Sequence, residues 1–309
     1  MGVPAPEHPE PRRHHYVPRC WLRGFTENGE NDGRLWVTDF SRQRQWPSSP
    51  ENAGHIRDFY RLGDDSPDPV AVETFFSALE NNVAPILRSI DAERRPPRND
   101  ELDVLLEFMA YQFVRLPAFR PFVLQLQDRI VREELERLLQ TPDTWRAALA
   151  AMGEDPNHPG TDYEGMRQFV EGREYNLRAE TAWFMERAFN DVDTILACLR
   201  ERYWGTSITH QGRLIASDNP VMLEGEREQL VGFRNAEFVF YPVSRHVFLT
   251  GTTVRVERPP LNFYYFARMN TMTLLRTDAQ VYSHIPDFVW CDRDRNTQQN
   301  WTLFSKDNF

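Results

Sequence analysis

The feature that most constrains this chain is a pair of strongly helical patterns between residues 69 and 117. The second pattern runs from Glu101 to Leu116, is apolar on nearly all sides and ends at Pro117, which cannot continue a helix. In the first, the apolar residues recur three or four positions apart and so share one helical face: Val72, Phe75, Phe76, Leu79, Val83, Ile86, Leu87 and Ile90. A helix that is apolar all round has to be buried, so the pair predicts a large core.

Strand-like segments lie on both sides of this helical region. Because units of two or three strands are marginal on their own, we expect the two strand regions to share a sheet that packs against the helices. The predicted fold class is therefore α+β. A further helix is expected at 262–277. The expected strands are short and rich in β-branched and aromatic residues: 16–22, 34–40 and 55–62 before the helices, and 206–210, 213–217, 237–244, 246–251 and 279–285 after them.

The same pattern predicts the domain organisation. Residues 1–13 contain four prolines and no apolar periodicity, which indicates a flexible arm. Residues 14–309 are predicted to form a single α+β domain. Within it we expect strands in 14–60, helices in 69–203, and strands plus one helix in 204–309.

Composition and charge exclude several classes of protein. With 40% hydrophobic and 13% aromatic residues, the chain of 309 residues has enough apolar material for a core. It contains no run of about 18 apolar residues, and its polar, proline-rich start is unlike a signal peptide, so we expect no membrane partner and a cytoplasmic location. The net charge of −10 argues against general coating of nucleic acid, although a local basic site is compatible with it.

Cysteine and histidine spacing predicts no preformed metal site. The three cysteines are far apart and lack CxxC spacing, which favours neither a disulfide framework nor a thiolate zinc site. A divalent metal would need ligands brought together from distant segments, so no cofactor is assigned. The histidines in the later strand-like segments show no HxH or HxxxH spacing: His55, His210, His246 and His284.

Two adjacent histidines, His14 and His15, open the first strand-like segment. Neighbours on a strand point to opposite sides, so at most one of them faces a given pocket, and we take His15 as a candidate acid or base. The HHYVP stretch is superficially similar to the first histidines of His-Asn-His nucleases. However, the later Asn and His are missing, and 16–25 is predicted as a strand where that metal unit needs a helix. The alternative is a purely structural role.

A second candidate is the turn Ser217-Asp218-Asn219, which follows a predicted strand and precedes Pro220. Three hydrogen-bonding side chains on a sharp turn can face a cleft, where Asp218 would be a general base or metal ligand and Asn219 an orienting donor. The alternative is that these residues only build an Asx turn.

Arg115 and Gln112 are the third candidate, because long polar side chains on a buried helix need a partner. Glu73 and Glu80 are seven residues apart and therefore lie on one face of the preceding helix, which makes them the natural internal partners. If the guanidinium instead faces a cleft, its shape suits a phosphate or a carboxylate.

An ordered series of short motifs extends over most of the chain: His15-Tyr16-Val17-Pro18, Leu22, Phe25, Leu35-Trp36-Val37, Phe59-Tyr60, Glu73, Glu80, Gln112 to Arg115, Arg120, Ser217-Asp218-Asn219-Pro220-Val221, Tyr241-Pro242-Val243-Ser244 and Asn270. From about residue 14 to about residue 285 the chain resembles the prokaryotic domain-of-unknown-function family numbered 4238. This resemblance implies a shared fold and brings no established activity. It adds Asn270 to the candidate substrate-binding residues.

Two functional predictions follow from these candidates. One is a hydrolase or transferase that acts on an anionic, phosphate-bearing or nucleic-acid-related substrate. The other is a non-catalytic ligand-binding or protein-interaction protein, in which the same groups form a structural polar network. A small anionic ligand or a nucleic acid is the expected partner. The expected catalytic residues are His15, Asp218 and Asn219, and the expected substrate-binding residues are Arg115, Gln112, Ser217 and Asn270.

Overall fold

The computed structural model describes residues 12–63, 66–155, 158–172, 180–226, 231–256 and 262–308. The chain divides into two compact units: a main unit, Met1–Leu116 with Met185–Phe309, and a helical unit, Pro117–Phe184. The predicted arm lies outside the described residues except for Arg12 and Arg13. The single domain predicted for 14–309 stays a prediction, because compactness does not show whether a unit folds independently.

Strands from the two ends of the chain share an antiparallel sheet in the main unit, as predicted. Its order is β3-β2-β10-β6, and the residue pair Val37 and Tyr282 joins the early strand β2 to the late strand β10. The fold is α+β, and the strand regions at the two ends are held together by backbone hydrogen bonds. The four strands are β2 (Leu35–Asp39), β3 (Arg44–Ser48), β6 (Ala216–Ser217) and β10 (Gln280–Ser283).

A second antiparallel sheet, of order β5-β9-β8-β7, comes entirely from the later part of the chain. It is formed by β5 (Tyr203–Ile208), β7 (Met222–Glu224), β8 (Phe238–Pro242) and β9 (Val247–Thr252). Two short strand pairs complete the described strands: β1 (Arg13–His15) with β4 (His55–Arg57), and β11 (Trp290–Cys291) with β12 (Thr297–Gln298).

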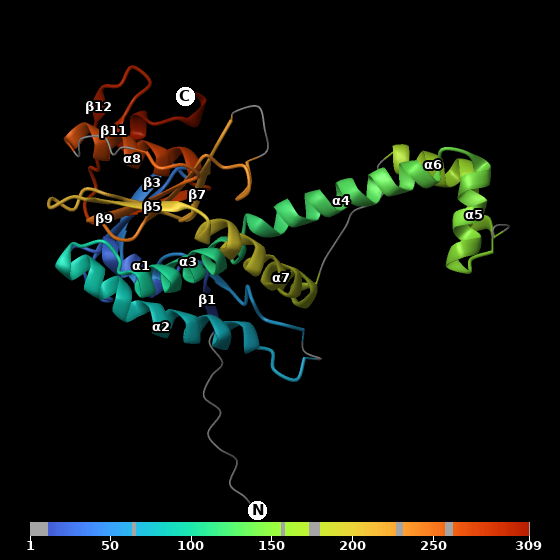
Figure 1. The fold of residues 1–309 in the computed structure, drawn as a ribbon, viewed down its shortest axis with the longest axis horizontal. Coiled ribbons are helices and arrows are strands. Elements are labelled where there is room, and N and C mark those ends of the chain that lie inside the picture. The colour runs from blue at the N-terminus through green and yellow to red at the C-terminus, as the bar shows by residue number, and fades with distance from the viewer. Residues whose placement is uncertain are drawn as a thin grey trace, which may run out of the picture. The chain divides into compact units, whose positions relative to one another are not determined.

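Helix α8 (Phe263–Arg276) packs against both sheets, and Figure 1 shows it on the opposite side of the β5-β9 sheet from α2 and α3. Its residue Phe266 contacts the core around Phe240 and Phe248 of the second sheet. Its residue Leu274 belongs to another cluster, together with Val281 of the first sheet. A helix with apolar contacts on both sides is a central element of the core.

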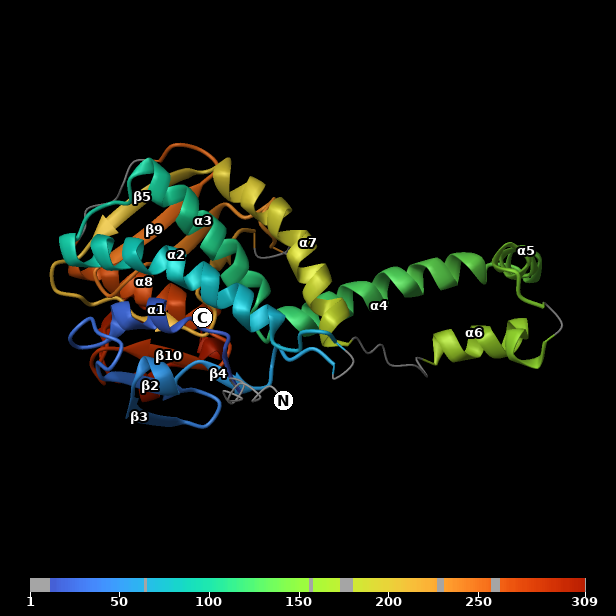
Figure 2. The same ribbon diagram turned by 90° about the horizontal axis from the view of Figure 1, so that it is seen from below.

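Three long helices cover the other side of the second sheet: α2 (Ala71–Glu93), α3 (Asn99–Val114) and α7 (Thr181–Arg200). In Figure 2 they lie side by side. An aromatic cluster of Phe75, Tyr111 and Phe189, with ring centroids 5.0 to 5.9 Å apart, joins them. The residues of α2 that the sequence periodicity placed on the inner face are buried: Val72, Phe76, Leu79, Val83, Leu87 and Ile90.

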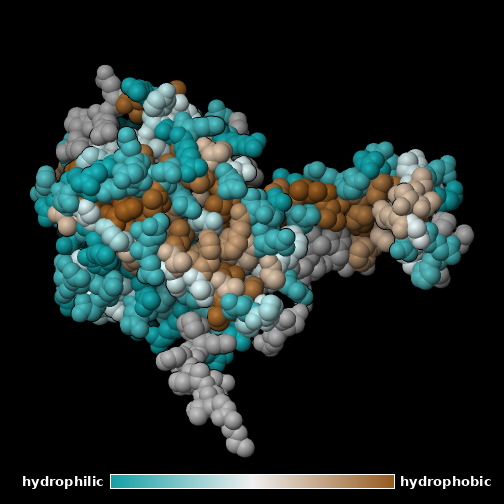
Figure 3. Space-filling model, turned by 60° about the horizontal axis from the view of Figure 1, so that its bottom comes forward, coloured by the Kyte–Doolittle hydropathy of each residue, from teal (hydrophilic) through white to brown (hydrophobic). Residues whose placement is uncertain are grey.

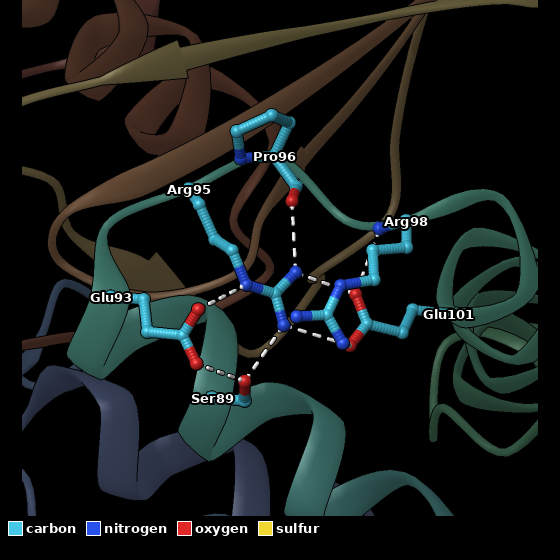
Figure 4. A network of polar contacts seen from close by, with 6 residues as sticks. All are labelled: Ser89, Glu93, Arg95, Pro96, Arg98 and Glu101. Atoms are coloured by element: carbon cyan, nitrogen blue, oxygen red, sulfur yellow. Dashed lines mark hydrogen bonds and ion pairs between the residues drawn. The ribbon is translucent and has the colours of Figure 1, made fainter.

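Arg95 fixes the connection between α2 and α3, as Figure 4 shows. Its Nη1 and Nη2 atoms bind the Glu101 carboxylate at 2.6 and 2.8 Å, and Nε binds Glu93 at 2.7 Å. Nη2 also donates to the Ser89 hydroxyl at 2.7 Å, and the Arg98 N–H donates to Glu101 at 2.8 Å. The Arg95 hydrogen bonds lower the pKa of Glu101 to about 2, so the carboxylate is charged over the whole neutral range.

The strand predicted for 16–22 is wrong, because Arg19–Leu22 forms a short helix, α1, that continues into the 3-10 turn Arg23–Phe25. The Leu22 N–H donates to the Pro18 carbonyl at 3.0 Å, which closes the first helical turn. The three buried apolar residues of this segment, Trp21, Leu22 and Phe25, have the spacing of a helical face. Trp21 also donates from Nε1 to the Pro242 carbonyl at 2.8 Å, which ties α1 to β8.

The helical unit contains α4 (Phe119–Leu138), α5 (Pro142–Met152) and α6 (Tyr163–Glu171). A small core of its own includes Trp145 and Val170. Helix α4 exposes apolar side chains four positions apart, and Figure 3 shows apolar surface along this unit: Phe122, Leu126 and Ile130. Among the described residues of both units, no helix has the length and apolar character needed to cross a membrane.

Candidate functional site

His15 is held in a fixed, neutral state by strand pairing and burial. The pairing of β1 with β4 places His15 opposite His55, with the two rings 5.4 Å apart. His15 Nε2 donates to the Glu51 carbonyl at 3.1 Å. Burial lowers the pKa of His15 to about 4, so the ring is uncharged near pH 7. On the other side of the strand, His14 Nδ1 accepts from the Tyr60 N–H at 2.8 Å.

Arg115 lies directly beside the backbone of His15. It ends α3 with 1% of its side chain exposed, and its Nη1 binds Glu80 at 3.0 Å. Its Nη2 donates to the His15 carbonyl, and its guanidinium stacks 4.2 Å from the ring centre of Phe76. The internal carboxylate partner expected from the sequence is therefore Glu80. The ion pair and the hydrogen bond to His15 together join β1, α2 and the end of α3.

The other residue of this candidate, Gln112, is completely buried beside the Tyr241 hydroxyl. Gln112 lies close enough to the Tyr241 hydroxyl to oppose the rise that burial causes in the pKa of Tyr241, although neither group makes a hydrogen bond of standard geometry within the described part of the chain. Oε2 of Glu73 likewise has no hydrogen-bond partner among the described residues, and burial raises the pKa of this carboxyl. Buried polar groups without a well-formed hydrogen bond are rare in folded proteins, and here several lie near Arg115.

Asp218 lies in a closed hydrogen-bonding arrangement. Its Oδ1 accepts from the Thr277 hydroxyl and the Asp278 N–H, both at 2.8 Å. Its Oδ2 accepts from the N–H groups of Ala279 and Gln280, at 2.8 and 2.7 Å. Burial raises the pKa of Asp218, and these four donors oppose that shift. The carboxylate thus stabilises the connection from α8 to β10.

The two neighbours of Asp218 also bind backbone groups. The Ser217 hydroxyl donates to the Asn219 carbonyl at 2.9 Å, and the Asn219 N–H donates back to that hydroxyl at 3.2 Å. Asn219 Nδ2 donates to the Arg276 carbonyl at 2.9 Å. The turn at 217–219 is therefore built by local bonds together with bonds to the end of α8.

Asn270 holds three backbone segments together from the middle of α8. Its Oδ1 accepts from the Ile215 N–H at 3.1 Å. Its Nδ2 donates to the carbonyls of Arg213 and Val289, both at 2.8 Å. All of these bonds go to main-chain groups, and Asn270 is completely buried.

The seven candidate residues thus fall into three groups. His15, Arg115 and Gln112 belong to the region of β1, α2 and α3, the turn at 217–219 lies at the end of α8, and Asn270 lies within α8. Among the described residues, no hydrogen bond or ion pair joins the first group to the second. Tyr16, the chain neighbour of His15, has its pKa raised to about 12 by burial and, to a smaller extent, by the Asp218 charge.

A pocket of about 260 Å³ lies next to the first group, between α1 and α2, and is called the α1–α2 pocket below. Two residues connect it to the candidate residues. Glu51 lines the pocket and accepts from His15 through its carbonyl, and Glu80 lines it and binds Arg115. The remaining polar lining is formed by three arginines, two asparagines and a cysteine: Arg19, Arg23, Arg88, Asn31, Asn81 and Cys20.

The cations of this pocket are only partly neutralised. Arg23 lies 3.7 Å from Glu30, a separation at which the ion pair is weak. Arg19 and Arg88 are exposed and make no hydrogen bond or ion pair with any described residue. Burial raises the pKa of the Cys20 thiol, which therefore stays protonated near neutral pH.

Sequence reasoning missed these pocket residues. Arg19 and Arg88 are single arginines in a chain with many, and no local spacing distinguishes them. The one available signal was the proximity of Arg19 to His15, which became meaningful only once 16–22 folded partly as a helix.

No metal centre is indicated by the described residues, since no three His, Cys, Asp or Glu side chains within them gather closely enough to hold an ion. His15 and His55 form only a pair, and His55 is partly exposed. A divalent metal, which the sequence left open, therefore has no ligand set among the residues described.

Comparison with known proteins identifies a family. The model of the family described as "Protein of unknown function (DUF4238)" matches residues 13–287, which include β1, the α1–α2 pocket, the turn at 217–219 and α8. No curated protein and no solved structure matches the chain. Because the matched region spans most of the sequence, the chain belongs to the DUF4238 family.

Proposed function

We propose that this protein binds a small anionic ligand in the α1–α2 pocket. The observation that carries the proposal is the pair of unpaired arginines in the pocket wall, Arg19 and Arg88. A guanidinium group is planar and offers several donors, which suits a carboxylate or a phosphate. Arg95 shows the contrast within the same molecule, because its guanidinium is already bound to Glu93 and Glu101. Arg19 and Arg88 are free to bind a ligand.

The rest of the lining limits the ligand. Asn31 and Asn81 offer amide groups, and Glu51 and Glu80 add acceptors and negative charge. These groups suit hydroxyl or amine substituents on the ligand, and the two carboxylates disfavour a long polyanion such as nucleic acid. A volume of about 260 Å³ lies just below the usual range of small-molecule sites, about 300–1,000 Å³, which limits the ligand to a small metabolite. The favoured ligand is therefore a small phosphorylated or carboxylated molecule with additional hydroxyl groups.

The geometry favours binding over catalysis. The Cys20 thiol in the pocket has a raised pKa and is a poor nucleophile. Asp218, the base expected from the sequence, would have to give up two hydrogen bonds at one of its oxygens before it could accept a proton. Hydrolysis or group transfer stays a prediction, and phosphate release from a phosphorylated ligand would support it.

Isothermal titration calorimetry on the full chain tests the proposal. The probes are ribose 5-phosphate and ribose at equal ionic strength, with citrate as a carboxylated probe. We expect binding of an anionic probe and no binding of ribose. Arg19→Gln and Arg88→Gln should each weaken that binding about tenfold, because each removes one charge-assisted contact.

The matched control is Arg187→Gln, which neutralises an exposed helical arginine whose side chain is 53% exposed. It should bind like wild type. The proposal fails if neither anionic probe binds at millimolar concentration, or if Arg19→Gln and Arg88→Gln bind as tightly as the Arg187→Gln control.

A further inference from the structure

Arg202 is a buried cation that lies between the end of α7 and the start of β5. Only 8% of the residue is exposed. Its Nη2 donates to the carbonyls of Phe233 and Ala236, at 2.7 and 2.9 Å. Its Nε and Nη1 are buried and have no hydrogen-bond partner in the described residues. The guanidinium thus makes hydrogen bonds from Nη2 and none from its other two nitrogens to the described residues.

No carboxylate balances this charge. Among the described residues Arg202 forms no ion pair, and Asp193 and Glu201 nearby are exposed. The two hydrogen bonds to neutral carbonyls offset only part of the cost of burying an ion that has no charged partner. Burial accordingly lowers the pKa of Arg202. An added anion would therefore stabilise the charged guanidinium of Arg202 strongly.

A pocket of about 660 Å³ lies at this position and is called the α7 pocket below. Arg202 and the exposed Arg234 contribute its two cations. Phe233 adds an apolar surface, and Thr194 and Thr253 add hydroxyl groups. This volume lies in the usual range of small-molecule sites, about 300–1,000 Å³, and most of the lining residues are polar or charged.

We propose that the α7 pocket is a second binding site, which takes a small oxyanion with an apolar body. The anionic group is attracted by the charge of Arg202 and pairs with Arg234, and the body contacts Phe233. Asp193 and Glu201 stand at the same pocket and repel extended polyanions, so the ligand carries one carboxylate or phosphate group. The site is separate from the α1–α2 pocket and does not depend on it.

Cys198 makes the site directly measurable, because its half-buried thiol lines the α7 pocket. The other two cysteines are poor competitors, since burial raises the thiol pKa of both Cys20 and Cys291. We therefore test the proposal by alkylation of the full chain with iodoacetamide, and peptide mass mapping assigns the modified cysteine.

The probes are benzoate and inorganic phosphate, each compared with sodium chloride at equal ionic strength. An oxyanion that fills the pocket should slow alkylation of Cys198 by about tenfold when its concentration is roughly ten times its Kd. Protection by benzoate alone supports a carboxylate ligand, and protection by phosphate supports a phosphate ligand. Equal rates in chloride, benzoate and phosphate would overturn the proposal.

Two variants connect the protection to the arginines. Arg202→Met removes the buried charge, and Arg234→Gln removes an exposed one without disturbing the core. Protection should be lost in the first and reduced at least threefold in the second, while Arg187→Gln should keep it. If Arg202→Met does not fold, Arg234→Gln still decides. Protection in Arg234→Gln equal to that of wild type would show that the anion does not occupy the α7 pocket.

Discussion

Replacement of Arg115 by methionine should lower the free energy of unfolding by about 3 kcal/mol. The Arg115 side chain is 1% exposed, and it binds Glu80 at 3.0 Å and the His15 carbonyl. A hydrogen bond to a charged group contributes about 1.5–3 kcal/mol, and removal of one partner of a buried ion pair costs about 3–5 kcal/mol. Because 18% of the Glu80 side chain is exposed, this carboxylate can regain some hydration, so we expect the lower end of that range.

The double variant Arg115→Met/Glu80→Met separates the ion pair from simple packing. It leaves no buried charge behind, so it should be more stable than Arg115→Met alone by about 1–2 kcal/mol. A loss of packing would instead make the double variant less stable than either single variant.

Equilibrium unfolding in guanidinium chloride, followed by circular dichroism and tryptophan fluorescence, measures these differences. The control Arg187→Met removes an exposed pair with Asp191, 3.4 Å long, and should change stability by less than about 0.5 kcal/mol. The reasoning is refuted if Arg115→Met unfolds at the same midpoint as wild type. It is also refuted if Glu80→Met does not relieve the loss.

Two other predictions concern the remaining candidate residues. The Asp218 carboxylate accepts four hydrogen bonds, and Asp218→Asn replaces one of its oxygens with an NH₂ group, so two donors lose their acceptor. The free energy of unfolding, measured by the same assay, should fall by about 3 kcal/mol. Asp143→Asn, at a side chain that is 89% exposed, is the control and should leave stability unchanged. His15 has a folded pKa of about 4, below the value of 6.5 for a free histidine, so the unfolded chain binds more protons between these values and stability falls as the pH drops from about 6.5 to about 4. His15→Gln should reduce this loss of stability. Part of the loss should remain, because the pKa of His284 is also lowered to about 4. Unfolding curves at pH 7 and pH 4.5 test this, and equal losses of stability in wild type and variant would contradict it.

Helix α2 illustrates what local pattern predicts well. Its apolar residues repeat with the helical period, and those on the inner face are buried in the fold. Phe75 and Ile86 were placed on the same face but are less buried, and Phe75 remains 38% exposed although its ring contacts Tyr111 and Phe189. Periodicity identifies a face, and neighbouring helices determine its width.

Helix α1 illustrates where local pattern misleads. The segment 16–22 has aromatic and β-branched residues typical of strands, but only four of its residues form the helix, too few for a period to be read. Its conformation depends on the contacts of Trp21 with Pro242 and Tyr241, which are more than two hundred positions away in the chain. Tertiary packing therefore overrides local propensity here.

The candidate residues divide in the same way. The need of Arg115 for an internal acid could be read from the sequence, because a charge on an apolar helix requires a partner and Glu80 lay on the adjacent helix. The environment of Asp218 could not, because its four donors lie in a loop about sixty residues later. A turn motif in the sequence does not reveal which distant backbone its side chain binds.

By itself the sequence determined the fold class, the sharing of a sheet by the two ends of the chain and the buried face of α2, because these follow from hydrophobic period and chain length. Only the tertiary structure decided which polar groups meet. Arg19 and Arg88 line one pocket although they come from different helices, and Arg202 is buried without a carboxylate although Asp193 and Glu201 are close in sequence. The physical reason is that hydrogen bonds and ion pairs form only between atoms a few ångströms apart, and those distances are set by how the helices and sheets pack.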